Sequence, residues 1–165
     1  MRNHIVIILV VLAALLAGCQ RVHHINDPLL SKKSVTPGST FAVVKPFLIP
    51  SGDSSVYFQD TQLYPQGEIQ PDFPYCQFLT GSATADGEVI KEQTLTVVNV
   101  EYDEKRTGAR GMVGSSTEFH LQSASSKKTY RMNCLLPVPS KSADFISPVE
   151  IEGVLGGYME LKVAP

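Results

Sequence analysis

The sequence has no excess of basic residues. Its 14 lysines and arginines are outnumbered by 16 aspartates and glutamates, and the formal net charge at pH 7 is -2 with neutral histidines. A protein whose main partner is a nucleic acid needs a concentrated basic face to neutralise phosphates. We therefore expect no nucleic-acid partner.

The sequence also lacks the short motifs that mark several kinds of site. It contains no Gly-x-Ser-x-Gly nucleophile elbow, no phosphate-binding Gly-rich loop ending in Gly-Lys-Ser/Thr, and no Cys-x-x-Cys pair. These absences argue against a serine hydrolase of that class, a nucleotide site and a thiolate metal site. We expect a non-catalytic protein with no cofactor and no catalytic residue.

Histidine is scarce, with four residues in the chain. His23 and His24 are adjacent, and adjacent side chains of an extended segment point in opposite directions, so these two cannot chelate one ion by themselves. His120 is predicted to lie on the outward face of a strand with Glu118 and Gln122. An exposed polar strand face is the default interpretation, and no metal site is expected. An envelope hydrolase that uses His120 with Glu118 remains a third hypothesis for function.

Only one long apolar run is present, and it stands near the start. Every residue from Ile5 to Ala17 is apolar, which makes 13 residues, and Arg2 precedes the run. A helix of this length covers about 20 Å, less than the roughly 30 Å hydrocarbon core of a bilayer. A cationic start, a short apolar core and small residues at the exit are typical of a secretory signal peptide.

The exit of that run is Leu16-Ala17-Gly18-Cys19, which closely resembles the lipobox of bacterial lipoproteins. The resemblance implies that Cys19 receives a diacylglycerol, that residues 1–18 are removed, and that the new amine takes a fatty acid such as palmitate. Several acyl chains anchor a protein durably, whereas a single chain gives only marginal binding. The next residue is Gln20 and not Asp, which by the family's sorting habit implies the outer membrane.

These features divide the chain into three parts. Residues 1–18 are the expected signal peptide, residues 19–38 a lipidated N-terminus and polar tether broken by prolines and glycine, and residues 39–165 a single periplasmic domain. Two cysteines remain after Cys19 is assigned to lipid, namely Cys76 and Cys134. An exported pair in an oxidising compartment is most simply a structural disulfide.

The pattern of the domain is mainly β. Short segments of alternating or β-branched residues are separated by turn residues, and we predict an antiparallel β-sandwich or a small barrel. In the segment 94–102, strict alternation places Val98 and Val100 on one face and Leu95 and Val97 on the other. The expected strands are 41–48, 56–59, 74–79, 94–102, 118–122, 129–135 and 158–163.

One short C-terminal helix is well signalled. Ser147 is the expected N-cap, Pro148 occupies the first helical position, and Glu150 stands at the third, which is a capping-box pattern. Ile151 and Leu155 then fall on one face. Gly156-Gly157 supplies the end of the helix.

The longest irregular stretch is predicted at 103–115. It contains Lys105, Arg106 and Arg110 among glycines, and arginine forks bind carboxylates or phosphates. We interpret it first as a flexible hairpin tip and second as a loop that contacts a partner. The aromatic and proline residues between Tyr57 and Tyr75 form a second candidate surface, although core packing explains them equally well.

The leading expectation is a lipid-anchored, non-catalytic β domain in the periplasm that contacts envelope proteins as an accessory, assembly or envelope-integrity factor. The arrangement of a VYFQ strand, a PYC strand, a second cysteine and a capped terminal helix is similar to small envelope lipoproteins of Gram-negative bacteria. The alternative is a binder of a small ligand in a barrel mouth.

Overall fold

The computed structural model describes residues 34–65, 67–70, 72–83, 85–107, 112–138 and 145–165. The chain divides into two compact units, residues 1–30 and 31–165, and every described residue belongs to the second. The expected signal peptide, Cys19, Gln20 and most of the tether lie outside the described residues. Among the described residues, no helix has the length and the hydropathy needed to cross a membrane.

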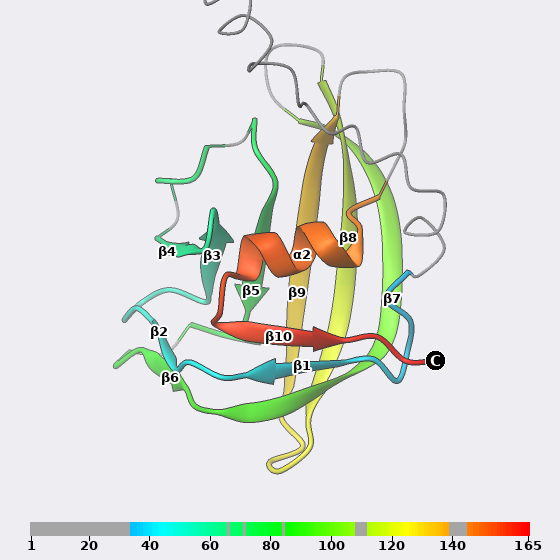
Figure 1. Cartoon of the computed structure of the whole chain (residues 1–165). Coiled ribbons are helices and arrows are strands. Elements are labelled where there is room, and N and C mark those ends of the chain that lie inside the picture. The colour runs from blue at the N-terminus through cyan, green and yellow to red at the C-terminus, as the bar shows by residue number, and fades with distance from the viewer. Residues whose placement is uncertain (1–33, 66, 71, 84, 108–111, 139–144) are drawn as a thin grey trace, which may run out of the picture. The chain divides into compact units, whose positions relative to one another are not determined.

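The domain is mainly β, as predicted, and its main element is a curled antiparallel sheet of eight strands that forms a half-barrel (Figure 1). The strand order is β10-β1-β7-β8-β9-β5-β3-β4. The long strands β7, β8 and β9 form its centre. The bounds are β1 Thr40–Val43, β3 Ser55–Gln59, β4 Gln62–Tyr64, β5 Tyr75–Leu79, β7 Gln93–Thr107, β8 Met112–Ser123, β9 Thr129–Val138 and β10 Met159–Lys162.

A second, two-stranded sheet pairs β2 (Phe47–Ile49) with β6 (Glu88–Ile90). The single strand predicted at 41–48 is therefore wrong, because β1 and β2 belong to different sheets. Pro46, which has no backbone N–H to donate, stands between the two strands. Phe47 joins the small sheet to the large one, since its ring packs edge-on against Phe58 at 5.2 Å and Phe78 at 5.3 Å between centroids.

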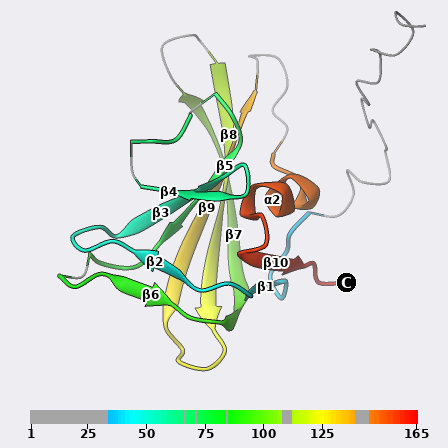
Figure 2. The same cartoon turned by 60° about the vertical axis from the view of Figure 1, so that its left-hand side comes forward.

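Helix α2 (Pro148–Leu155) lies across one face of the large sheet (Figure 2). The predicted capping box is confirmed: the Ser147 hydroxyl accepts from the backbone N–H of Glu150, and the Glu150 carboxylate accepts from the backbone N–H of Ser147. Gly156 ends the helix in the left-handed conformation, with φ 51°.

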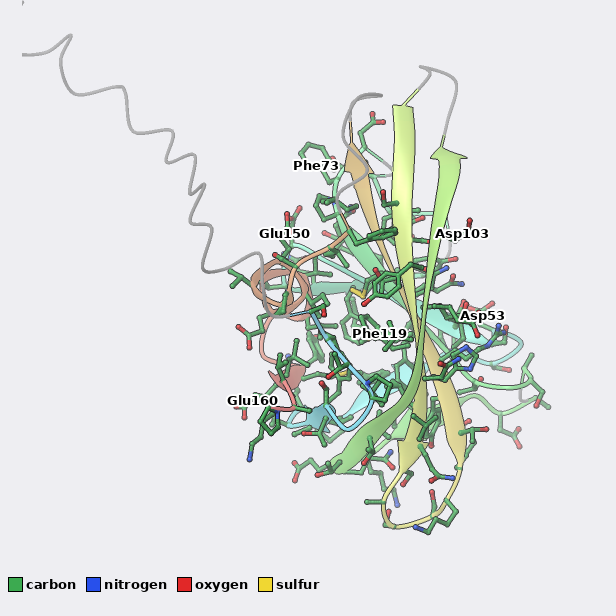
Figure 3. All side chains as sticks on the ribbon, turned by 90° about the vertical axis from the view of Figure 1, so that its right-hand side faces the viewer. Asp53, Phe73, Asp103, Phe119, Glu150 and Glu160 are labelled. Atoms are coloured by element: carbon green, nitrogen blue, oxygen red, sulfur yellow. A yellow bond between two sulfur atoms is a disulfide. The ribbon has the colours of Figure 1, made fainter. Side chains whose placement is uncertain are left out.

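The hydrophobic core lies between α2 and the face of the large sheet that α2 covers, here called the inner face. Figure 3 shows Phe119 between the long strands and the helix. Ile151 and Leu155 are fully buried, as predicted, and Val154 is buried beside them. Alternation along β8 and β9 also holds, because the strands place their apolar residues inward. The residues of these two strands that belong to the hydrophobic core are Phe119, Leu121, Tyr130, Met132 and Cys134.

The folded unit begins earlier than the sequence indicated. Val35 is buried in the core, with 4% of its surface exposed, and the backbone N–H of Gly38 donates to the carbonyl of Val97. The last part of the expected tether, from Val35 to Gly38, therefore packs against the domain.

A β-bulge corrects the predicted faces of strand β7. The register with β8 shifts between Val97 and Asn99, so that Val98 is an extra residue on β7. Leu95 and Val97 point into the core as buried residues, and after the bulge Val100 packs against the same core. Val98 is half exposed. Strict alternation, which placed Val98 and Val100 on one face, fails at this position.

The predicted irregular stretch at 103–115 is also mostly strand. Residues 103–107 of β7 pair with residues 112–116 of β8, which leaves only the tip of the hairpin outside the described residues. The interpretation as a hairpin therefore holds, but the turn is much shorter than expected.

The predicted disulfide joins Cys76 to Cys134 across 58 positions of the chain. The two residues are register partners on the neighbouring strands β5 and β9, with Cα atoms 4.0 Å apart, and both are fully buried. The two cysteines are part of the hydrophobic core, where reductants in solution have no access to the sulfurs.

We predict that replacing both cysteines with alanine lowers the free energy of unfolding by about 4 kcal/mol, the loop-closure entropy of a bridge of this span. Urea denaturation of the variant and of the oxidised protein measures the difference. A loss below about 1 kcal/mol would contradict the chain-entropy argument.

The end of α2 provides a second stability prediction. A Cβ at Gly156 would lie 2.1 Å from the Cβ of Thr61, in the β3–β4 turn, whereas a Cβ at Gly157 would meet nothing within 4 Å. Both glycines have positive φ, so alanine at either position costs roughly 1 kcal/mol for the backbone conformation. We expect Gly156→Ala to cost about 2 kcal/mol more than Gly157→Ala because of overpacking. Equal losses in thermal unfolding would show that the turn does not contact the helix end.

Candidate functional site

The candidate site lies on the outer face of the large sheet, the face turned away from α2. Strand alternation that sends apolar residues inward sends polar residues to this face. His120 of β8 is the register partner of Arg131 on β9 and of Asn99 on β7, and Arg131 is in turn the partner of Leu79 on β5. These four residues therefore form one row across the sheet.

A neighbouring row contains two carboxylates. Glu118 of β8 and Glu101 of β7 are register partners. The Nε2 atom of His120 lies 3.0 Å from a carboxylate oxygen of Glu101 and 3.5 Å from one of Glu118. That nitrogen is buried and makes no hydrogen bond of acceptable geometry, so the short distances describe a charge contact that acts when the imidazole is protonated.

Further polar contacts fix the two carboxylates. The side-chain amide of Asn99 donates to Glu101 at 3.1 Å, and Arg131 donates from one guanidinium nitrogen to Glu118 at 3.4 Å. The latter contact is long for a charge-assisted hydrogen bond, and the Arg131 side chain is half exposed. Most of its five N–H donors are therefore available to another acceptor.

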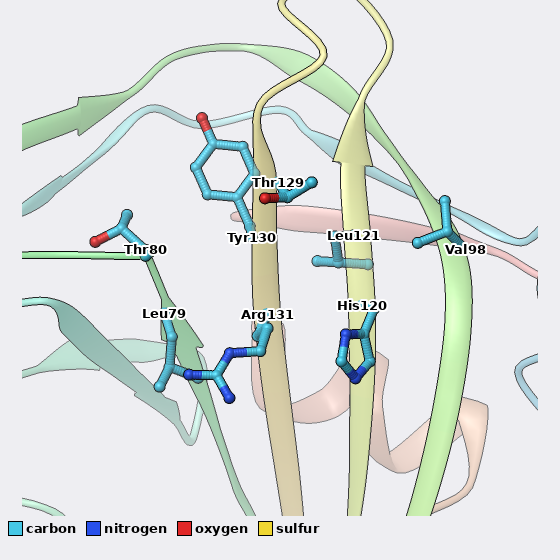
Figure 4. A pocket seen from close by; sticks show the side chains of 9 residues that line it. Leu79, Thr80, Val98, His120, Leu121, Thr129, Tyr130 and Arg131 are labelled. Carbon is cyan, nitrogen blue, oxygen red and sulfur yellow. The ribbon is translucent and has the colours of Figure 1, made fainter.

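A half-open hollow of about 280 Å³ lies beside His120 and Arg131 on this face. Figure 4 shows that the Arg131 side chain extends from β9 towards Leu79 on β5, while Val98 on β7 stands at the other side of the hollow. No aspartate or glutamate lines it. The side chains that matter for its chemistry are Leu79, Thr80, Val98, His120, Thr129 and Arg131.

The bulge in β7 shapes one wall of this hollow. Val98 follows the inward Val97, so its side chain faces outward and is half exposed, and the bulge adds a second outward residue, Asn99, directly after it opposite His120. Bulges commonly redirect a side chain at functional positions. The opposite wall is fixed by Thr80, whose hydroxyl shares its one hydrogen between the carbonyls of Ser54 and Ser82, each 3.1 Å from the hydroxyl oxygen.

The described residues do not offer a metal centre, since no group of three or more histidine, cysteine, aspartate or glutamate side chains among them is placed to hold an ion.

The charged side chains around His120 are arranged with acidic residues at one end and a basic residue at the other. Glu101 and Glu118 form an acidic end, and Arg131 forms a basic end beside the hollow. Such a face can bind a partner that carries both charges in a fixed order.

The inner face, in contrast, is occupied by side chains of the domain itself. Phe41, Phe119, Leu121 and Met132 fill it and are covered by α2. Towards the far end of β8 it becomes polar, where the hydroxyls of Ser115 and Thr117 are buried and have no partner among the described residues.

For the basic residues of the predicted 103–115 loop, the structure describes only part of the backbone. Lys105 and Arg106 lie in the last part of β7, where their backbones pair with Gly114 and Val113. Their side chains, and the whole of Arg110, lie outside the described residues. His120 and Glu118 share the outer face as predicted, with an ion-pair distance between them.

Several residues of the hollow were missed by sequence reasoning. Alternation in 129–135 could have placed Arg131 on the outer face, because Tyr130 and Met132 are inward. Nothing in the sequence indicated that Arg131 would be the register partner of His120, since the pairing depends on the turn between β8 and β9. The bulge at Val98 had no sequence signal such as a glycine.

The aromatic candidate surface is mostly buried. Phe58 is a core residue, and Tyr57 is buried on the outer side, with its ring 6.0 Å from that of Tyr75. Phe73 remains half exposed. Burial, together with the nearby Tyr57, raises the pKa of the Tyr75 phenol above its ordinary value of 10.0.

No protein-family model matches the chain, and neither a curated protein nor a solved structure matches it.

The raised pKa of Tyr75 predicts an effect of alkaline pH. The folded state holds the phenol proton more tightly than the unfolded state, so the contribution of Tyr75 to stability is complete below about pH 10. It is lost as the pH rises through the folded pKa. Tyr75→Phe should therefore flatten the fall of unfolding free energy above about pH 10 relative to the wild type. A slope identical to that of the wild type would contradict the burial argument.

Proposed function

We propose that the chain is a lipid-anchored, non-catalytic protein of the periplasm, held at the outer membrane by Cys19. It acts through contacts with another envelope protein, as an accessory, assembly or envelope-integrity factor. No cofactor and no nucleic acid takes part. The observation that carries the contact function is the outer face of the half-barrel, which presents the charged residues Glu101, Glu118 and Arg131 beside a hollow.

The proposal of an anchor is supported by how the cysteines are used. Cys76 and Cys134 bind each other in a buried disulfide, so neither is available to pair with Cys19. Cys19 follows Leu16-Ala17-Gly18, the pattern that resembles a lipobox. A disulfide of this kind also fits an oxidising compartment such as the periplasm.

A protein contact is favoured over a small-ligand binder by the contents of the two faces. Barrel-type ligand binders keep an internal cavity, but the apolar part of the inner face that the structure describes is a packed core that includes residues of α2. The hollow on the outer face, about 280 Å³, is below the range of roughly 300–1,000 Å³ typical of pockets for drug-sized ligands. It is large enough for a side chain of a partner.

The anchor has a direct test. We predict that Cys19→Ser releases the protein from the membrane fraction or leaves it unprocessed, because the thiol that carries the lipid is removed. Detergent phase partitioning and the mass of the mature N-terminus measure both effects. Gln20→Asp is the matched control: it should keep the lipid and move the protein to the inner membrane. Membrane association of Cys19→Ser equal to that of the wild type would refute the anchor.

The contact function is tested by photo-cross-linking in living cells. A photoreactive amino acid replaces Val98 on the outer face or, as the control, Val149 on α2, which is exposed to a similar extent at 58% against 50%. We expect a discrete cross-linked product with an envelope protein from position 98 and none, or much less, from position 149. Equal or absent cross-linking at both positions would argue against this face as the contact surface.

A further inference from the structure

We propose that the hollow on the outer face receives an aliphatic side chain of the protein partner, and that Arg131 binds a carboxylate next to that side chain. This inference rests on the proposed contact function and specifies the chemistry of the partner. It concerns the residues Leu79, Val98 and Arg131, which three different strands bring together.

The apolar part of the partner is indicated by the walls. Leu79 and Val98 face the hollow from β5 and β7, and Val98 is half exposed. An exposed valine gains free energy when an apolar group covers it, at roughly 25 cal/mol for each Å² buried. The hollow is too small for a typical organic cofactor and suits one branched aliphatic side chain.

The carboxylate is indicated by charge. Among the residues that line the hollow, Arg131 carries the fixed charge, His120 and Tyr130 are titratable, and none is acidic; Glu118, in the neighbouring row, lies 3.4 Å from Arg131 and 3.5 Å from His120. Arg131 uses one nitrogen in a long contact of 3.4 Å with Glu118, which leaves its remaining donors for a bidentate contact with a second carboxylate.

The acidic residues of the neighbouring row set the orientation. Glu118 and Glu101 lie in the row next to that of His120 and Arg131, and they repel a carboxylate that approaches over that row. The partner's carboxylate must therefore lie at the Arg131 end. A basic residue of the same partner can then face Glu101, whose side chain is 60% exposed.

N-acetyl-leucine is a small probe that combines these two groups, and N-acetyl-leucinamide is the corresponding molecule with an uncharged amide in place of the carboxylate. We expect N-acetyl-leucine to shift the NMR signals of the Val98 methyls and the Arg131 amide in the full-length lipidated protein in micelles. A dissociation constant on the order of millimolar is expected for a ligand of this size. N-acetyl-leucinamide should bind roughly tenfold more weakly, because it offers no carboxylate to the guanidinium.

Arg131→Gln should abolish the difference between the two probes, while Lys162→Gln, which removes an exposed cation from β10, should preserve it. Binding of both probes with equal affinity, or unchanged binding to Arg131→Gln, would overturn the role of Arg131. Absence of any shift at the solubility limit of N-acetyl-leucine would overturn the proposal as a whole. Cross-linking from position 98 that persists in that case would show that the contact function stands and that only the partner chemistry is wrong.

Discussion

Helix α2 buries Ile151, Val154 and Leu155 against the inner face of the curled sheet, and this packing determines what each face of the domain can do. Each such side chain contributes about 1.5–3 kcal/mol when fully buried, an upper estimate against an extended chain. An eight-stranded sheet that curls without closing would otherwise expose its apolar inner residues. The helix replaces the missing wall and turns a potential ligand cavity into a core.

With the inner face occupied, the outer face of β5, β9, β8 and β7 becomes the surface with chemistry to offer. Two local features distinguish it from an ordinary solvated sheet face. At the bulge Val98 and Asn99 follow each other on the outer face, and the pairing of β8 with β9 places Arg131 beside His120. The buried disulfide between β5 and β9 holds the register of this region, because Cys76 and Cys134 stand opposite each other in the same ladder that aligns Leu79 with Arg131. Rigidity of the sheet and geometry of the contact surface are therefore linked.

The sequence predicted the parts of this fold that are governed by local chemistry. The capping box at Ser147 and Glu150, the inward residues of β8 and β9 and the disulfide follow from spacing and residue type, and all are confirmed. The parts that depend on distant pairing were missed. Strands β4 and β6 have three residues each, too few for a periodic signal, and the bulge at Val98 arises from the register with β8. The hollow could not be predicted, because it combines residues from four strands and the loop at Thr80.

The most direct test of this account is the packing of α2 on the inner face. Nuclear Overhauser effects between the methyl groups of Leu155 and the ring protons of Phe58 and Phe78 report whether the helix occupies that face in solution. The account predicts strong effects from Leu155, since α2 packs against β3 and β5. Their absence, together with a solvent-accessible Leu155, would contradict it and would return the inner face to consideration as a ligand site.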